Sequence, residues 1–194
     1  MTDRPIIFSA PMVRALLTGR KTQTRRLASS PLARCAVGDR LYVREAWAPL
    51  SACTHNDPGS QAMADNGFYR ADGGTIEGQI SRWTPSIHQP RWASRLTLTV
   101  VDARIQPLCS ITDADAQAEG VQQIAGGWHV PEADLPQMPT AAGAFARLWS
   151  SLHRTDGECW CDNPDVVALT FTVTAENIDR MAASAANPQE SARG

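Results

Sequence analysis

The residues of this chain best suited to chemistry lie between residues 18 and 26. Lys21 is the only lysine among 194 residues, and every other basic residue is an arginine. Lysine can lose its proton when it is buried or placed near other cations, whereas arginine effectively cannot. Thr24 follows three residues later, and a neutral amine can deprotonate a threonine hydroxyl to make it a nucleophile. The alternative is a solvated Lys21 in a loop before a strand, because K-x-x-T alone is a weak motif.

A second set of side chains lies in a segment whose Pro85 and Pro90 exclude a regular helix and most sheet pairing. Aromatic rings, guanidinium planes and hydrogen-bonding side chains can together hold an unstacked base. We predict that this segment binds such a ligand through Trp83, Ser86, His88, Arg91 and Trp92. The alternative is that both tryptophans are core anchors and that Arg91 pairs with a carboxylate.

Charged and aromatic residues also alternate in Arg44-Glu45-Ala46-Trp47, and two arginines follow Thr24 directly. We predict that these residues complete the substrate-binding set. Its further members are Arg25, Arg26, Arg44, Glu45 and Trp47.

Composition limits the classes of protein to consider. Hydrophobic residues make up 43% and charged residues 20%, which is typical of a soluble globular protein. The formal net charge of −2 excludes a nucleic-acid binder that relies on overall charge, although basic residues dominate between Arg4 and Arg44. No apolar run approaches the roughly 20 residues of a membrane span. We therefore expect no membrane partner.

The five cysteines are an odd number, and no secretory signal precedes them, which favours a reducing, cytoplasmic location. Cys53-x-His55 and Cys159-x-Cys161 offer four zinc ligands, but structural zinc sites usually have two to four residues between paired ligands. We predict no metal and no other cofactor.

Hydrophobic patterning predicts an α+β fold of short strands with helices inserted between them. Strands are expected at 6–8, 41–47, 68–70, 94–105 and 166–173, and helices at 11–18, 112–119 and 141–153. We expect a small, mostly antiparallel β-barrel with flanking helices over residues 4–174. Loop insertions are predicted near 50–67 and 120–140, and a disordered tail over 175–194.

The ordered series of motifs resembles the ASCH domain family, whose fold is similar to that of the PUA domain. The resemblance covers nearly all of residues 4–174 and is closest to the longer ASCH proteins of phages and prophages. It rests on Phe8 to Leu17, Gly19 to Arg26, Gly38 to Trp47, Trp83 to Arg95, Asp113 to Gly120, the Trp149 helix and the Val166–Val173 strand.

The resemblance implies a cleft beside the barrel that binds RNA or a modified nucleoside. One short branch of the family is a metal-independent N(4)-acetylcytidine amidohydrolase that uses a lysine, a threonine and a glutamate. The first two fall on Lys21 and Thr24 in the same G-x-K-T-x-T-x-R context, and the third falls on Glu119 by its position in a helix. The alternatives are a non-catalytic module that binds RNA or a modified nucleotide, or a ribonuclease.

Overall fold

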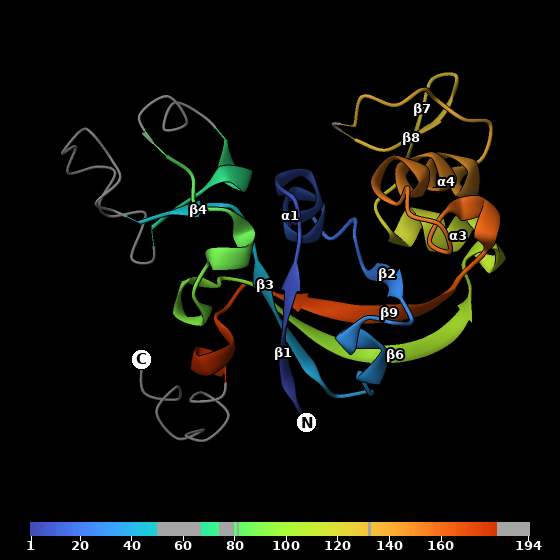
Figure 1. Cartoon of the computed structure of the whole chain (residues 1–194). Helices are drawn as coiled ribbons and strands as arrows, with labels where there is room; N and C mark the ends of the chain where they lie inside the picture. The colour runs from blue at the N-terminus through green and yellow to red at the C-terminus, as the bar shows by residue number, and fades with distance from the viewer. Residues whose placement is uncertain (50–66, 74–79, 81, 132, 182–194) are drawn as a thin grey trace. The chain divides into compact units, whose positions relative to one another are not determined.

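The computed structural model describes residues 1–49, 67–73, 80, 82–131 and 133–181 (Figure 1). The predicted insertion at 50–67 lies outside these residues, except for Gly67. Contacts within the chain define two compact units. The first unit comprises Met1–Thr2, Ala15–Asp39 and Thr99–Val173, and the second comprises Asp3–Arg14, Arg40–Leu98 and Thr174–Gly194.

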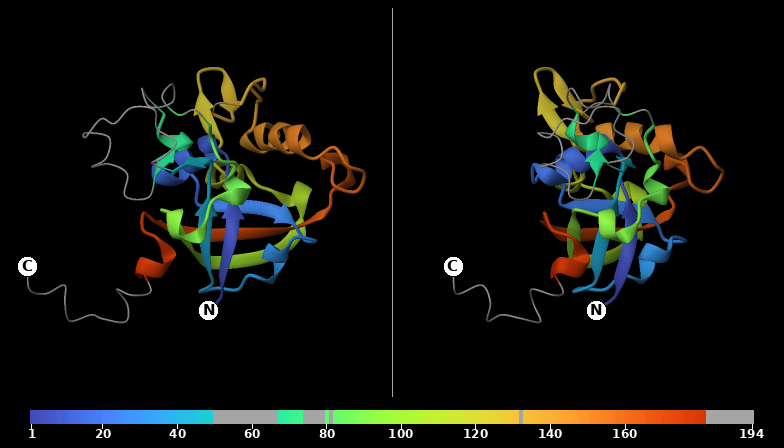
Figure 2. Two further views of the ribbon diagram at one scale, coloured as in Figure 1. Left: turned by 60° about the vertical axis from the view of Figure 1, so that its left-hand side comes forward. Right: turned by 90° about the vertical axis from the view of Figure 1, so that its left-hand side faces the viewer.

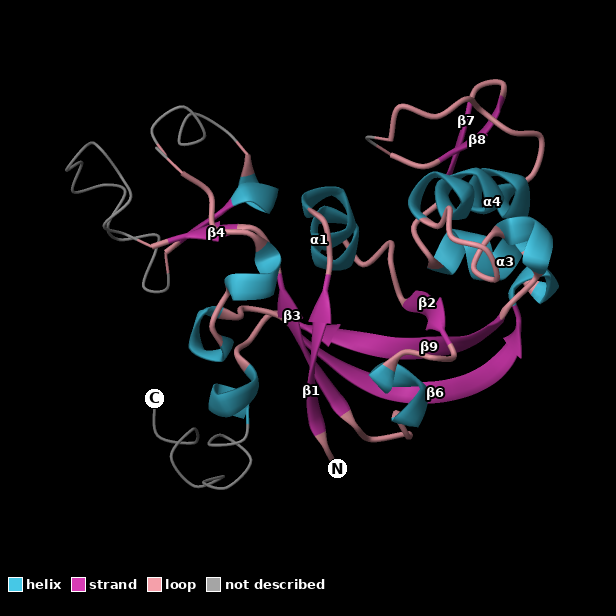
Figure 3. Cartoon of the chain, viewed as in Figure 1, coloured by secondary structure: helices cyan, strands magenta, loops and turns pink. Residues whose placement is uncertain are grey.

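The first unit contains most of a long strand and two further strands, hydrogen-bonded in the order β6-β9-β2. Their bounds are β6 Thr97–Pro107, β9 Asp165–Thr174 and β2 Gln23–Leu27. Strand β2 runs antiparallel to β9 (Gln23 is opposite Thr170), and β6 and β9 lie side by side in opposite directions (Figures 2 and 3). Residues 166–169 of β9 are all buried, which is typical of a strand covered on both faces.

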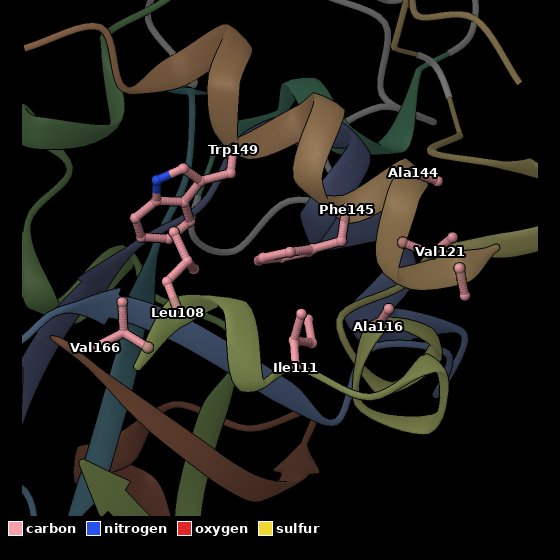
Figure 4. Packing of buried hydrophobic residues seen from close by; sticks show 9 residues of the cluster. Leu108, Ile111, Ala116, Val121, Ala144, Phe145, Trp149 and Val166 are labelled. Atoms are coloured by element: carbon pink, nitrogen blue, oxygen red, sulfur yellow. The ribbon is translucent and has the colours of Figure 1, made fainter. Parts of the chain in front are cut away.

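Two helices of the first unit enclose its hydrophobic cluster. Helix α3 (Asp113–Ala118) begins with a capping box in which Thr112 and Asp115 bond each other's backbone N–H groups. Helix α4 (Ala141–Leu152) directs Phe145 and Trp149 toward the residues at the end of β6 and the start of β9 (Figure 4). The cluster consists of Leu108, Ile111, Ala116, Val121, Ala141, Ala144, Phe145, Trp149 and Val166.

The predicted insertion at 120–140 contains a hairpin rather than only a loop. Strands β7 (Gln122–Ile124) and β8 (Gly127–His129) pair antiparallel. The backbone groups of Trp128 and Met138 also exchange two hydrogen bonds of 2.8 Å. Gly127 is required there, because a Cβ at this position would lie 2.6 Å from the carbonyl oxygen of Met138. The hydrophobic periodicity of so short a segment was too weak to predict it.

In the second unit, β1 (Asp3–Ile7), β3 (Arg40–Arg44) and the beginning of β6 are neighbours in that order, and β1 is parallel to β3. Helix α1 (Ala10–Leu17) begins in this unit with Pro11 in its first turn, as predicted. The strand predicted over 41–47 ends at Arg44, and Trp47 and Ala48 form a separate short strand, β4, antiparallel to β5 (Phe68–Tyr69).

The chain remains packed beyond residue 174, so the prediction of disorder from 175 is wrong for residues 175–181. Ile178 is fully buried, and the amide of Asn177 donates hydrogen bonds to the carbonyl oxygens of Arg91, Trp92 and Ser94. Ala175, Ile178 and Met181 recur at a spacing of three, but a segment this short gives too weak a periodicity to reveal the contact. Residues 182–194 lie outside the described part of the chain.

The structure confirms a mixed α+β fold with a mainly antiparallel sheet and few helices. Closure of that sheet into a barrel stays a prediction. In the described part of the chain, every helix is too short or too polar to cross a membrane.

The Thr112 cap generates the first testable prediction, because α3 carries Glu119 at its C-terminal end. Replacing Thr112 with alanine should reduce the free energy of unfolding by about 1 kcal/mol, since one backbone N–H loses its acceptor. For a chain of this size the melting temperature should fall by about 2–4 °C. Ser150→Ala, on the exposed face of α4, is the matched control and should melt within about a degree of the wild type.

Candidate active site

The loop that carries Lys21 is fixed by its backbone to three elements of the first unit. The Lys21 N–H donates to the carbonyl oxygen of Ala15, and the Thr22 N–H donates to that of Ala118 at 2.8 Å. The Phe171 N–H donates to the carbonyl oxygen of Thr22 at 2.9 Å. These bonds hold the loop between α1, the end of α3 and strand β9. They also occupy two N–H groups of this loop.

Lys21 is buried against the glutamate that the resemblance implies. Its side chain is 1% exposed, and its Nζ lies 2.7 Å from Oε2 of Glu119, whose side chain is 5% exposed. The same Nζ donates to the Glu119 carbonyl oxygen at 3.0 Å. Gly120 follows with a φ of +106°, a conformation that favours glycine. The chain can therefore turn away immediately after presenting both oxygens to the ammonium group.

The surroundings of Lys21 favour its neutral form relative to a lysine in water. Burial lowers the pKa of Lys21, and the positive charges of Arg26 and Arg25 act in the same direction. The Glu119 carboxylate opposes these effects, because it stabilises the ammonium group by charge and by a hydrogen bond. The direction that prevails is a lowered pKa, which is the property required of a lysine base at neutral pH.

Arg25 shares Glu119 with Lys21. Its Nη1 donates to Oε1 of Glu119 at 3.2 Å and also to the side-chain oxygen of Gln23. Its Nη2 lies 3.2 Å from Oδ2 of Asp115. Among the described residues, no acceptor completes a hydrogen bond to Nε or Nη2, although both atoms are buried. Buried guanidinium groups of this kind can donate to an anionic or carbonyl group of a ligand.

Thr24 and Arg26 alternate with Gln23 and Arg25 along β2. The charge of Arg26 acts on Lys21 and interacts with Glu119. The Thr24 side chain is fully buried, and its Oγ1 accepts a hydrogen bond of 2.7 Å from Nη1 of Arg26. Burial lowers the pKa of Arg26, and Glu119 opposes this effect. A guanidinium donor at Oγ1 stabilises negative charge that develops on that oxygen.

The remaining predicted binding residues lie in the second unit. The Glu45 carboxylate is 1% exposed and accepts from Nε of Arg95 at 2.9 Å. Burial raises the pKa of Glu45, and Arg95 acts against this rise. Arg44 donates to the carbonyl oxygen of Gln89, whose side-chain oxygen accepts from the Glu45 N–H. The side chains of Arg44 and Glu45 therefore both take part in hydrogen bonds within the second unit.

Trp92 and Trp47 form an edge-to-face pair with ring centroids 5.6 Å apart. Trp92 is 57% exposed, whereas Trp47 is buried. Trp83 is partly buried and packs against a small hydrophobic cluster that includes Phe68, as the core-anchor alternative expects. Arg91 forms ion pairs with the carboxylates of Asp3 and Asp179, which is the alternative considered for this residue.

Ser86 and His88 lie in a short 3-10 turn, with His88 exposed and Ser86 half-buried. Ser86 contributes to the lining of a cavity of about 410 Å³ that arginines also line. The other lining residues are Phe8, Ser9, Ala10, Pro11, Arg14, Ala46, Arg70 and Gly73. That this segment and the lysine loop form one cleft stays a prediction.

Sequence reasoning missed Gln23 and Asp115 as parts of the Lys21 site. The Asp115 carboxylate caps the start of α3 and also pairs with Arg25. Gln23 could have been found from the strand period, because it stands two residues before Arg25 and so shares its face.

Comparisons with known proteins do not assign a family. No protein-family model matches the chain, and no curated protein matches it. Among solved structures, one described as the crystal structure of hypothetical protein PH0355 aligns with a TM-score of 0.44 and 10% sequence identity. The alignment covers 90% of this chain and 100% of that one. A likeness at this level carries no argument about function.

The ion pair generates the second testable prediction. Glu119→Gln should reduce the free energy of unfolding by about 3–5 kcal/mol near pH 7, because it leaves the buried ammonium group without its counter-charge. The loss should shrink as the pH rises toward about 10. The pKa of Lys21 is lower in the folded chain than in the unfolded chain, where it is about 10.4. At pH values between the lowered pKa of Lys21 in the folded chain and its pKa in the unfolded chain, the unfolded chain binds more protons. The free energy of unfolding therefore rises with pH in this window.

Chemical denaturation of the wild type and the variant at several pH values measures this effect. The double variant Lys21→Met/Glu119→Gln is the matched control, and it should recover much of the lost stability because the buried ammonium group is gone and Arg25 keeps its pairing with Asp115. A loss that is independent of pH and persists in the double variant would contradict the ion-pair interpretation.

Proposed function

We propose that this protein is a metal-independent amidohydrolase that removes the acyl group from a modified nucleoside such as N(4)-acetylcytidine. We further propose that its sheet closes into a barrel of the PUA-like, ASCH type. The observation that carries the proposal is the setting of Lys21, which is hydrogen-bonded to Glu119 and has a lowered pKa. Three residues later stands Thr24, whose hydroxyl accepts a hydrogen bond from Arg26.

The first step of the proposed reaction is attack by Thr24. Neutral Lys21 takes the hydroxyl proton, and Oγ1 forms a bond to the acyl carbonyl carbon of the substrate. Lys21 then returns the proton to the leaving nitrogen as the bond between carbon and nitrogen breaks. Water hydrolyses the resulting ester and regenerates the hydroxyl.

Glu119 and Arg26 have supporting roles in this mechanism. Glu119 fixes Nζ of Lys21 through two hydrogen bonds, so the amine cannot rotate away between steps. Arg26 donates to Oγ1 of Thr24 and so stabilises the alkoxide as it forms. The N–H groups of Lys21 and Thr22 already donate to protein carbonyls, so the guanidinium groups are the better donors for the oxyanion.

A second candidate function is a module that binds RNA or a modified nucleotide without turnover. The observation that favours it is the complete burial of Thr24, because a nucleophile must reach its substrate. In this function the half-buried Arg26 would contribute a binding group, and the Thr24 hydroxyl would not need to reach the ligand.

Substitution of Lys21 separates the two candidates and gives the third testable prediction. Lys21→Arg keeps the positive charge but cannot act as a base, so turnover of N(4)-acetylcytidine should fall by about 100- to 10,000-fold. Thr24→Ala should lose a similar factor, and the double variant should add little because base and nucleophile act as one unit. The measurements are deacylation by chromatography and binding by calorimetry.

Two controls protect this test from effects on folding. Arg20→Lys is an arginine-to-lysine change one position earlier, on a half-buried side chain that bonds Thr18, and should leave turnover unchanged. Thr24→Ser retains a hydroxyl and should retain most of the activity. Binding of the nucleoside without wild-type turnover, unaffected by Lys21→Arg, would favour the binding module and contradict the enzyme.

A further inference from the structure

A cluster of thiol and carboxylate groups lies in the connection between α4 and β9, in the first unit. Cys159, Cys161 and Asp162 each offer one ligand atom, and these three atoms lie within 4.8 Å of one another. Two of the residues are exposed and Cys159 is half-buried, so an ion can reach them from solvent. The proposed amidohydrolase mechanism uses none of them.

The backbone of this connection holds the Asp162 carboxylate in a fixed orientation. Oδ2 accepts hydrogen bonds from the N–H groups of Gly157, at 2.9 Å, and Cys159, at 3.1 Å. The other oxygen, Oδ1, lies 3.8 Å from Sγ of Cys161. One oxygen therefore fixes the turn while the other faces a thiol, the arrangement in which a metal-binding carboxylate is itself held by hydrogen bonds.

A third cysteine docks on the same turn from a distant part of the chain. The Cys109 N–H donates to the side-chain oxygen of Asn163 at 2.7 Å, and its Sγ lies 3.5 Å from the carbonyl oxygen of Trp160. The thiols of Cys109 and Cys161 are also close enough to interact electrostatically. Cys109 is therefore the candidate for a fourth ligand.

Carboxylates and an imidazole surround the cluster, together with the guanidinium group of Arg154, which lines the same cavity. The carboxylates of Asp156 and Asp162 both act electrostatically on Cys159. His153 lines a cavity of about 410 Å³ together with Cys159 and Cys161. An imidazole beside the thiols is a further group with an affinity for zinc.

We propose that Cys159, Cys161 and Asp162, with Cys109 as the fourth ligand, form a structural site for Zn²⁺. Tetrahedral coordination with zinc–sulfur bonds of about 2.3 Å suits two thiolates and a carboxylate that are already this close. On binding, the thiols lose their protons to solvent. The ion links the residues after β6 to the connection that leads into β9.

The spacing of Cys159 and Cys161 alone did not favour zinc, because one intervening residue is unusual for paired ligands. The sequence offered Cys53 and His55 as the other two ligands. The structure substitutes Asp162, which adjoins the pair, and Cys109, which lies about fifty residues earlier.

Metal titration of the reduced, chelator-stripped protein tests the proposal. Zn²⁺ should bind with a stoichiometry of one per chain in competition with a chromophoric chelator, and should raise the melting temperature. Co²⁺ in place of Zn²⁺ should give a sulfur-to-cobalt charge-transfer band and the visible absorption of a tetrahedral site. Cys159→Ser and Cys161→Ser should each weaken binding by at least about 10- to 100-fold, the cost of losing even an outer-shell partner.

Further variants distinguish the ligands. Cys109→Ser and Asp162→Asn should each weaken binding and alter the cobalt spectrum, whereas Cys35→Ala, which removes a cysteine outside the cluster, should bind as the wild type does. The proposal is overturned if no charge-transfer band appears, or if one-to-one binding survives the Cys159→Ser/Cys161→Ser double variant. Loss of binding in Cys53→Ser with retention in Cys109→Ser would also overturn the assignment of the fourth ligand.

Discussion

A lysine ammonium group held out of water by one carboxylate is the interaction on which the first unit depends. Removing these charges from solvent costs several kcal/mol, which is recovered only if the hydrogen-bond geometry is good. Glu119 provides that geometry because it ends α3 and offers both its carboxylate and its carbonyl oxygen to Lys21. The Thr112 cap, the left-handed Gly120 and the backbone bonds of Thr22 all serve to place these two residues together.

The charges around this pair are unequal in number. Three cations, Lys21, Arg25 and Arg26, lie near two carboxylates, Glu119 and Asp115. Burial lowers the pKa of Lys21, with Arg26 and Arg25 acting in the same direction, and Nε and Nη2 of Arg25 have no hydrogen-bond acceptor among the described residues. Such an environment suits a reaction in which negative charge develops on an oxygen, and it equally suits a bound anionic group.

Local patterns in the sequence predicted most of the regular structure. Hydrophobic patterning identified the strands that became β6 and β9, and the helix expected at 112–119 is α3. The sequence also selected Lys21, because one lysine in a chain of arginines is visible without a structure. The β7–β8 hairpin was missed because its strands have only three residues each and show no clear period.

The sequence by itself determined which residue types were present and which short segments would form helices and strands, because these depend on neighbours a few positions away. It could not determine that Lys21 meets a carboxylate 98 residues later, or that Cys109 docks on the turn at Trp160. It also gave no indication that the Thr24 hydroxyl would be fully buried beneath Arg26. Burial, charge pairing and the pKa of Lys21 depend on which distant segments pack together, and only the tertiary structure decides that.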